Sequence, residues 1–141
     1  HVRPPVAEAI AEILTRAGVQ VFDAKSVVVG SGRLVGKPAA ALLADLGAHV
    51  TVMRKGDSLA ALKDADIVIL GAGEPGLVKP EHLKQGVVLI DAGTSEMGGK
   101  VAGDADPACA EIASVFTPVP GGVGPIAVAM IFKNLFDLSA E

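Results

Sequence analysis

The sequence predicts an α/β domain with a mostly parallel β-sheet flanked by helices on both faces. Three observations support this prediction. Short, almost wholly apolar runs recur along the chain, as in strands that are buried on both faces of a sheet. Segments with helical spacing of apolar residues separate these runs, and glycine-rich turns follow several of them. Strands and helices that alternate in this way form right-handed βαβ units around a parallel sheet.

The expected elements follow one another in a regular order. A helix begins near Pro5, because proline is tolerated in the first turn, and Gly18 ends it. Further helices are expected at 35–46, just after Pro80, and at 126–138 as a closing helix. A short helix capped by Ser58 is expected to run through Lys63. Strands are expected at 26–30, 49–53, 65–70, 87–91 and 115–116, with a tight turn at 97–100 between short extended pieces. This order is typical of a Rossmann-like domain.

Composition and charge exclude several classes of function. The 141 residues are 50% hydrophobic and 20% charged, unlike a disordered chain. No apolar run reaches the roughly 18 residues of a membrane span. A formal net charge of −4 without a basic run is unlike a nucleic-acid-binding surface. The single cysteine, Cys109, excludes an internal disulfide, and no metal-ligand spacing occurs. We therefore expect a cytoplasmic protein without membrane, nucleic-acid or metal partners.

The clearest candidate site is the glycine-rich segment that follows the first strand and opens a helix. Glycines there allow a tight turn and let backbone N–H groups approach a pyrophosphate, and the helix N-terminus adds the positive end of its dipole. The spacing is G-x-G-x-x-x-G, one residue longer than the commonest fingerprint, and the alternative is a βα turn that binds nothing. We predict dinucleotide contacts from Gly30, Ser31, Gly32, Arg33, Val35 and Gly36.

Basic residues follow the second strand, where such folds normally decide between the two nicotinamide cofactors. A carboxylate there accepts hydrogen bonds from the ribose hydroxyls of NAD, whereas cations hold the 2′-phosphate of NADP. Arg54 and Lys55 come first, which favours NADP over NAD. A solvated charge pair at the strand end is the alternative, and Asp57 is close enough in sequence to reach a ribose.

Three further loops are expected at the same edge of the sheet, because the carboxyl ends of parallel strands meet there. Segments 71–76 and 91–94 follow the third and fourth strands, and 117–125 combines three prolines with three glycines. A rigid loop with few side chains lets a flat ligand lie against backbone, although ordinary turns or a bend between domains explain these segments equally well. The residues expected to contact the cofactor are Ala72, Gly73, Gly93, Thr94 and Thr117.

Several conspicuous side chains are assigned structural roles instead. His49 lies within the second strand, where a histidine is more often structural than catalytic. Cys109 lies in an alanine-rich stretch and is expected to be a small buried apolar residue. Asp104 and Asp106 are expected at a turn or at a helix cap.

The segment 117–130, TPVPGGVGPIAVAM, closely resembles the signature of the bifunctional methylenetetrahydrofolate dehydrogenase/methenyltetrahydrofolate cyclohydrolase family. Segments 35–38, 65–68, 90–93 and 103–106 also occur in the family's order and spacing, so the resemblance covers nearly the whole chain. It implies NADP-linked oxidation of the one-carbon unit on tetrahydrofolate, and hydrolysis of the methenyl product to the formyl form. It also implies a homodimer and a place in one-carbon metabolism and purine biosynthesis.

Carried over position by position, the resemblance assigns Gly30, Ser31 and Gly32 to the family's dinucleotide contact. Lys55 falls at the adenosine ribose or its phosphate, and Thr94 falls near the nicotinamide. The chain departs from the family's Arg and Ser at Ser31 and Gly32, although Arg33 can restore the charge, and from its His-Ser pair at 54–55. The substrate-side loop is assigned to Pro120, Gly121, Gly122, Val123 and Gly124.

The family resembled here carries its catalytic lysine, and the tyrosine that assists it, in an N-terminal folate domain. This chain contains no tyrosine, and none of its lysines matches the catalytic position. We therefore expect residues 1–141 to be one NAD(P)-binding domain without catalytic residues. Helices at 1–18 and 124–141 would connect it to a missing domain that holds tetrahydrofolate, and the isolated chain would be inactive.

Two interpretations from other classes remain open. The chain could be a stand-alone dinucleotide-binding or regulatory module, or a dimerisation unit whose cofactor site has decayed, which Ser31 and Gly32 permit. A shikimate or amino-acid dehydrogenase is a further option, but it leaves the segment rich in proline and glycine unexplained. Titration with cofactor separates the dimerisation unit from the others.

Overall fold

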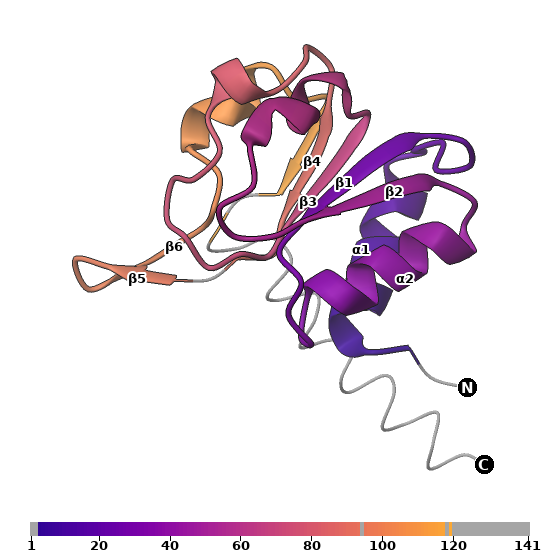
Figure 1. Cartoon of the computed structure of the whole chain (residues 1–141), viewed down its shortest axis with the longest axis horizontal. Coiled ribbons are helices and arrows are strands. Elements are labelled where there is room, and N and C mark those ends of the chain that lie inside the picture. The colour runs from indigo at the N-terminus through magenta and orange to yellow at the C-terminus, as the bar shows by residue number, and fades with distance from the viewer. Residues whose placement is uncertain (1–2, 94, 118, 120–141) are drawn as a thin grey trace.

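The computed structural model describes residues 3–93, 95–117 and 119, and its centre is a parallel sheet (Figure 1). The sheet contains β1 (Lys25–Val29), β2 (His49–Met53), β3 (Ile67–Leu70), β4 (Val88–Asp91) and β7 (Val115–Thr117). Its strand order is β2-β1-β3-β4-β7, and every neighbouring pair is parallel. The predicted α/β class and parallel sheet are confirmed. Strand order reverses between β1 and β3, and such folds bind ligands outside the carboxyl ends of the strands at that point.

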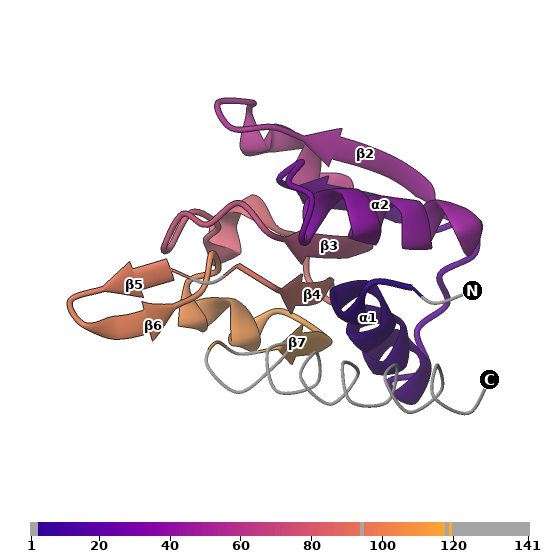
Figure 2. The ribbon, with the colours of Figure 1, turned by 90° about the horizontal axis from the view of Figure 1, so that it is seen from below.

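Different helices cover the two faces of the sheet (Figures 1 and 2). The α-helices α1 (Pro5–Arg16) and α2 (Gly36–Asp45) pack on one face, in a core with Val28, Ile69 and Ile90. The other face packs against short 3₁₀-helices, in a core with Val27 and Leu89. Neighbouring residues of β1, β3 and β4 enter opposite cores, which explains why these strands read as continuous apolar runs, whereas most of β2 is exposed. The 3₁₀-helices are η1 (Leu59–Asp64), η2 (Pro80–His82) and η3 (Pro107–Glu111).

The predicted helix boundaries follow from local chemistry. Proline occupies the first turn of α1, and Gly18 follows its end with φ +68°, a conformation that glycine adopts without steric cost. Ser58 caps η1 as predicted, since its side chain accepts a hydrogen bond from the N–H of Ala60 at 3.2 Å. The element is a 3₁₀-helix of six residues rather than an α-helix. The sequence pattern did not predict η3.

A β-hairpin projects from the body of the domain in both views (Figures 1 and 2). Its antiparallel strands are β5 (Ser95–Met97) and β6 (Lys100–Ala102). The turn between them contains Gly98 and Gly99, whose φ angles are +61° and +80°. Positive φ at both central residues is the geometry that two-residue hairpin turns require, so the predicted tight turn is confirmed.

The described residues bear only in part on two expectations, the closing helix and the absence of a membrane span. The predicted closing helix at 126–138 lies outside the described residues. Among the helices that the structure describes, none combines the length and the apolar character needed to cross a bilayer.

Candidate functional site

The loop after β1 is built by backbone contacts that only glycine permits. Gly30 has φ +111°, and its N–H donates to the carbonyl of Met53 at 2.8 Å. A Cβ atom on Gly30 would lie 2.6 Å from the carbonyl oxygen of Gly71, and one on Gly36 would lie 2.1 Å from the carbonyl oxygen of Gly30. The end of β1 therefore meets the start of α2 and the loop after β3 through backbone atoms, and the Val35 side chain packs against Gly71.

Between these glycines the chain is open to solvent. Ser31, Gly32 and Arg33 are exposed, and the first residue of α2 is preceded by Val35, which offers no side-chain acceptor as an N-cap. Helix N–H groups without a capping side chain are suited to bind an anionic oxygen, and the helix dipole favours the same charge. One N–H of the first turn is already used, since that of Lys37 donates to the Gly32 carbonyl at 2.9 Å. Binding of a pyrophosphate by this loop stays a prediction.

A buried aspartate fixes the loop after β3. Asp104 is completely buried, and its carboxylate accepts hydrogen bonds from three consecutive N–H groups. The N–H groups of Ala72 and Gly73 donate to Oδ2 at 2.7 and 3.3 Å, and that of Glu74 donates to Oδ1 at 2.9 Å. A Cβ on Gly93 would lie 2.3 Å from the Asp104 carboxyl carbon. Asp104 thus holds the loops after β3 and β4 against each other.

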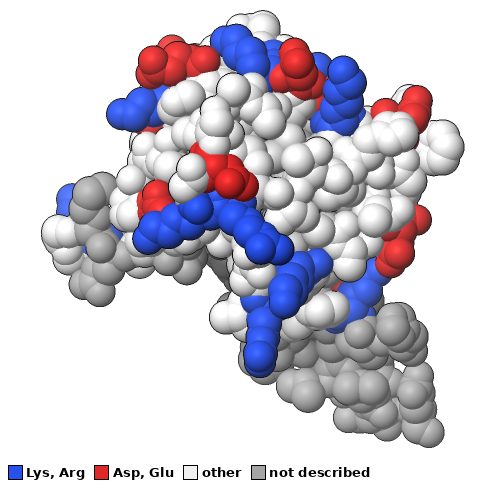
Figure 3. Space-filling model, in the orientation of Figure 1, with Lys and Arg blue, Asp and Glu red and all other residues white. Residues whose placement is uncertain are grey.

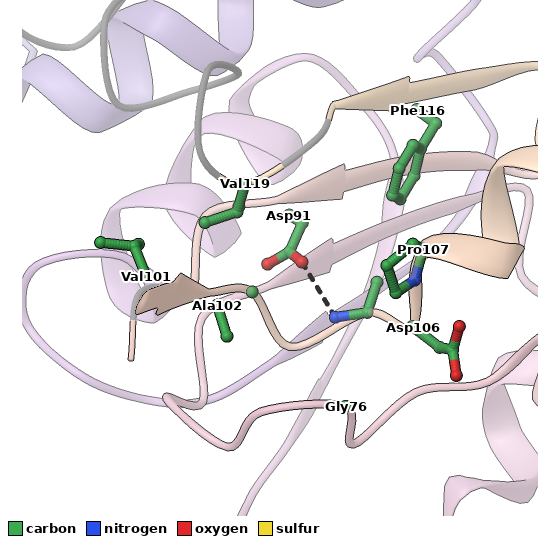
Figure 4. Close-up of a pocket in the computed structure, with 10 residues that line it drawn as sticks. Gly76, Asp91, Val101, Ala102, Asp106, Pro107, Phe116 and Val119 are labelled. Carbon is green, nitrogen blue, oxygen red and sulfur yellow. Dashed lines mark hydrogen bonds between the residues drawn. The ribbon is translucent and has the colours of Figure 1, made fainter. Parts of the chain in front are cut away.

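A second buried aspartate, Asp91 at the end of β4, holds Asp104 in place. Its Oδ1 accepts from the N–H groups of Gly93 and Asp104 at 3.0 and 3.2 Å. Its Oδ2 accepts from the N–H of Ala105 at 2.9 Å, the dashed line in Figure 4. Burial is the largest influence and raises the pKa of both carboxyl groups. The hydrogen bonds that they accept from backbone N–H groups lower the pKa in part. Thr117 joins the network, since its hydroxyl oxygen accepts from the N–H of Asp91 at 2.8 Å.

A cavity of about 380 Å³ lies beside Asp91, outside the predicted cofactor site (Figure 4). Its walls are mostly apolar, and Val101, Phe116 and Val119 contribute to them. The carboxylates of Asp91 and Asp106 line it too, but both already accept backbone N–H groups. None of the predicted cofactor contacts lines this cavity.

The predicted basic pair lies in an exposed turn at the end of β2. Asp57 closes this turn: its carboxylate accepts from the N–H of Arg54 at 2.8 Å, and its own N–H donates to the Arg54 carbonyl at 3.0 Å. One oxygen of the Asp57 carboxylate is therefore engaged in the turn, and a contact of Asp57 with a ribose stays a prediction. The Nζ of Lys55 lies 3.7 Å from Oε1 of Glu74. Figure 3 shows basic side chains in a band that runs from the end of β2 toward the start of α2.

The structure brings together most of the predicted site residues that it describes. Gly30 packs against the backbone of Gly71. The Asp104 carboxylate accepts hydrogen bonds from Ala72 and Gly73, and the same carboxylate packs against Gly93. Two parts of the prediction, Thr94 and the substrate-side loop 120–124, lie outside the described residues.

Three residues that were assigned structural roles can now be placed. Asp106 caps η3 as expected, accepting from the N–H of Ala108 at 2.9 Å. His49 lies 2.6 Å from the carboxylate of Asp23, at the exposed start of β2. Cys109 is completely buried, and burial raises the pKa of its thiol to about 11, so it carries no thiolate at neutral pH. The described residues contain no group of three or more side chains able to hold a metal ion.

Sequence reasoning missed two residues of this edge. Asp104 was expected to cap a helix or a turn, yet its carboxylate binds a loop 30 to 32 residues earlier in the chain. Glu74 was not singled out, although it faces Lys55. The sequence around either residue gives no sign of its role. The partners of Asp104 are backbone amides, and the partner of Glu74 is a side chain from another loop.

Comparison with known proteins adds a direct match. Residues 4–141 match the model of a protein family described as "Tetrahydrofolate dehydrogenase/cyclohydrolase, NAD(P)-binding domain". The chain belongs to this family. The resemblance inferred from the segment rich in proline and glycine is thereby confirmed, and the glycine-packed edge of the sheet is the edge of an NAD(P)-binding domain.

Individual relatives agree with the family match. The bifunctional protein FolD of Halothermothrix orenii is 44% identical over 128 residues, which are 89% of this chain and 45% of the relative. FolD of Thermomicrobium roseum is 43% identical over 129 residues, again 45% of its length. The chain thus spans about half the length of the curated relatives that it matches.

Solved structures show the same relation. The structure of FolD from Trypanosoma brucei, complexed with NADP cofactor and an inhibitor, has a TM-score of 0.91 and 37% identity. That match covers 99% of this chain and 52% of the other. The FolD dehydrogenase/cyclohydrolase of Campylobacter jejuni has a TM-score of 0.89 and 32% identity, over 93% of this chain and 48% of the other.

The glycine contacts predict different outcomes for two alanine substitutions in the same loop. Gly36→Ala places a Cβ atom against the backbone of Gly30 and should lower the free energy of unfolding by about 1–3 kcal/mol. Gly32→Ala meets no atom within 4 Å and should change it by less than about 0.5 kcal/mol. Urea unfolding of both variants measures this. Equal effects would contradict the packing described.

The buried aspartates and a surface aspartate should titrate in opposite directions. Burial raises the pKa of Asp91 and Asp104, so their contribution to stability is present below pH 3.8 and is lost as pH rises through their folded pKa values. A hydrogen bond from Lys84 lowers the pKa of Asp66, so its contribution is present above pH 3.8 and is lost as pH falls through the folded value.

An NMR titration of the carboxyl carbons tests this contrast. Asp91 and Asp104 should show midpoints above 3.8, and Asp66 a midpoint below it. Lys84→Met should move the Asp66 midpoint up and leave that of Asp104 unchanged. If all three carboxyl groups titrated with the same midpoint, burial would not control the pKa values of Asp91 and Asp104.

Proposed function

We propose that this chain is the cofactor-binding half of an enzyme that oxidises methylenetetrahydrofolate with NADP and hydrolyses the methenyl product to formyltetrahydrofolate. The observation that carries the proposal is the glycine-packed junction of β1 and α2, where Cβ atoms at Gly30 and Gly36 would collide with backbone. This junction lies at the reversal of strand order in a chain of the NAD(P)-binding family.

The first loop is suited to hold the pyrophosphate. Ser31, Gly32 and Arg33 are exposed between two tightly packed glycines, so a phosphate can approach their backbone closely. The uncapped start of α2, at Val35 and Gly36, adds N–H donors and the positive end of the helix dipole. Arg33 supplies a full positive charge beside them.

The end of β2 is suited to hold a 2′-phosphate. Arg54 and Lys55 are exposed there, and the hydrogen bond from Gly30 to Met53 keeps this strand end beside the first loop. Asp57 closes this turn, and both basic side chains are exposed. We therefore assign the 2′-phosphate to this pair, and NADP as the preferred cofactor over NAD.

The loops after β3 and β4 and the end of β7 are assigned to the nicotinamide side, with Ala72, Gly73, Gly93, Thr94 and Thr117 as contacts. When bound, NADP supplies the hydride chemistry, and the domain orients it and tunes its electrostatic surroundings. Loop 120–124 would face tetrahydrofolate held by a further domain, which contributes the acid and base groups. The support is that the relatives named bifunctional FolD are about twice as long as this chain.

We further propose that residues 1–141 form one domain, joined to the folate domain through helices at 1–18 and 124–141. The resemblance also supports a cytoplasmic homodimer that serves one-carbon metabolism and purine biosynthesis. In this proposal the chain by itself binds cofactor and has no cyclohydrolase activity.

Calorimetric titration with NADP and with NAD tests the proposal. The chain should bind NADP more tightly than NAD, and Arg54→Ala with Lys55→Ala should weaken NADP binding at least about tenfold with little effect on NAD. A matched control removes one exposed arginine and one exposed lysine at the opposite edge of the sheet, Arg16→Ala with Lys25→Ala, and should leave both affinities unchanged.

Two results would contradict separate parts of the proposal. If the chain binds both cofactors and the Arg54 and Lys55 substitutions change neither affinity, the assignment of the 2′-phosphate site is wrong and that of the dinucleotide site stands. Absence of binding to either cofactor would overturn the cofactor-binding function and favour a dimerisation unit.

A further inference from the structure

A carboxylate stands opposite the proposed 2′-phosphate site. Glu74, in the loop after β3, places Oε1 3.7 Å from the Nζ of Lys55. The side chain of Lys55 is 87% exposed, whereas that of Glu74 is 35% exposed. The lysine of this ion pair is thus almost fully in solvent, and the glutamate is partly enclosed by the protein.

The backbone around Glu74 is fixed on both sides. Its N–H donates to the buried carboxylate of Asp104 at 2.9 Å, and its carbonyl accepts from the N–H of Leu77 at 3.2 Å. Two residues on, the N–H of Gly76 donates to the carbonyl of Gly103 at 3.2 Å. Hydrogen bonds on both sides of Glu74 therefore hold the backbone that carries its carboxylate.

The two nicotinamide cofactors differ in charge at the position that Glu74 faces. NADP brings a 2′-phosphate, which the Glu74 carboxylate repels and which must compete with it for Lys55. NAD brings a ribose hydroxyl at the same position, and a carboxylate is the group that accepts a hydrogen bond from it. A basic pair and a carboxylate at one site therefore favour opposite cofactors.

We propose that Glu74 is a specificity-determining residue, which limits the preference of this domain for NADP by pairing with Lys55. Bound NADP takes Lys55 away from Glu74, whereas bound NAD leaves the ion pair intact. This inference rests on the proposed cofactor site. It makes the chain an NADP-binding domain with residual affinity for NAD, in which one side chain controls the ratio of the two affinities.

Glu74→Gln is the direct test, because it removes the charge and keeps the shape. The dissociation constant for NADP should fall roughly two- to fivefold, the range expected for an exposed ion pair, and that for NAD should stay the same or rise. The gain should shrink at high salt, which screens exposed charges. Glu111→Gln, which removes one exposed negative charge at the end of η3, should leave the ratio of affinities unchanged.

A double substitution separates this role from a structural one. In a Lys55→Gln background, Glu74→Gln should improve NADP binding less than it does in the parent chain, since the competing ion pair is already gone. The melting temperature should be unaffected by Glu74→Gln, because an exposed pair contributes little to stability.

The outcomes distinguish this inference from the function on which it rests. If the parent chain binds neither cofactor, the proposed function and the inference both fail. If the parent chain binds NADP through Arg54 and Lys55, but Glu74→Gln changes both affinities alike or changes neither, the inference is wrong and the proposed function stands. The inference is equally wrong if Glu111→Gln shifts the ratio of affinities as much as Glu74→Gln does.

Discussion

Three hydrogen bonds from consecutive backbone amides to the buried carboxylate of Asp104 hold the functional edge of the sheet together. A buried carboxylate is costly unless hydrogen-bond donors replace the water that it has lost. Here the amides of residues 72–74 supply those donors, and the pKa of Asp104 still lies above its usual value because burial is the stronger influence. Removing the acceptor would leave three amides without partners, which couples the loop's shape to one side chain.

Asp91 extends this constraint to the rest of the edge. It accepts the N–H groups of Asp104 and Ala105, so the segment that carries Asp104 is itself held by the end of β4. Gly93 and Gly103 complete the arrangement, because a Cβ at either position would collide with one of the two carboxyl groups. A site whose loops are already ordered loses less conformational entropy when a ligand binds, which is how such a network would serve a cofactor-binding domain.

The same constraint sets the electrostatics beside the first loop. Because Asp104 holds the amide of Glu74, that carboxylate stays close to the exposed turn that carries Arg54 and Lys55. We proposed above that a bound phosphate and the partly enclosed carboxylate of Glu74 compete here for the exposed side chain of Lys55. In the proposal made above, the balance of this competition, rather than the number of basic residues, decides how strongly the domain separates the two cofactors.

Much of this architecture could be predicted from the sequence. Apolar runs such as 67–70 carry a strong signal because both faces of the strand are buried, and Gly30 and Gly36 are recognisable since the backbone approach leaves no room for a side chain. The role of Asp104 could not be predicted, because its partners are backbone amides, which look the same in every sequence. The pairing of Glu74 with Lys55 depends on how two loops lie in space, and η3 is too short for helical periodicity to show.

Amide hydrogen exchange in the parent chain and in Asp104→Asn tests most directly whether this carboxylate holds the edge. We expect slow exchange at Ala72, Gly73 and Glu74 in the parent chain. Exchange at these amides should be at least about tenfold faster in the variant, because the asparagine side chain has a single acceptor oxygen and carries no charge. Asp106→Asn, two residues along, should leave them protected. Rapid exchange at the three amides in the parent chain, or unchanged protection in Asp104→Asn, would show that the Asp104 carboxylate does not hold the edge.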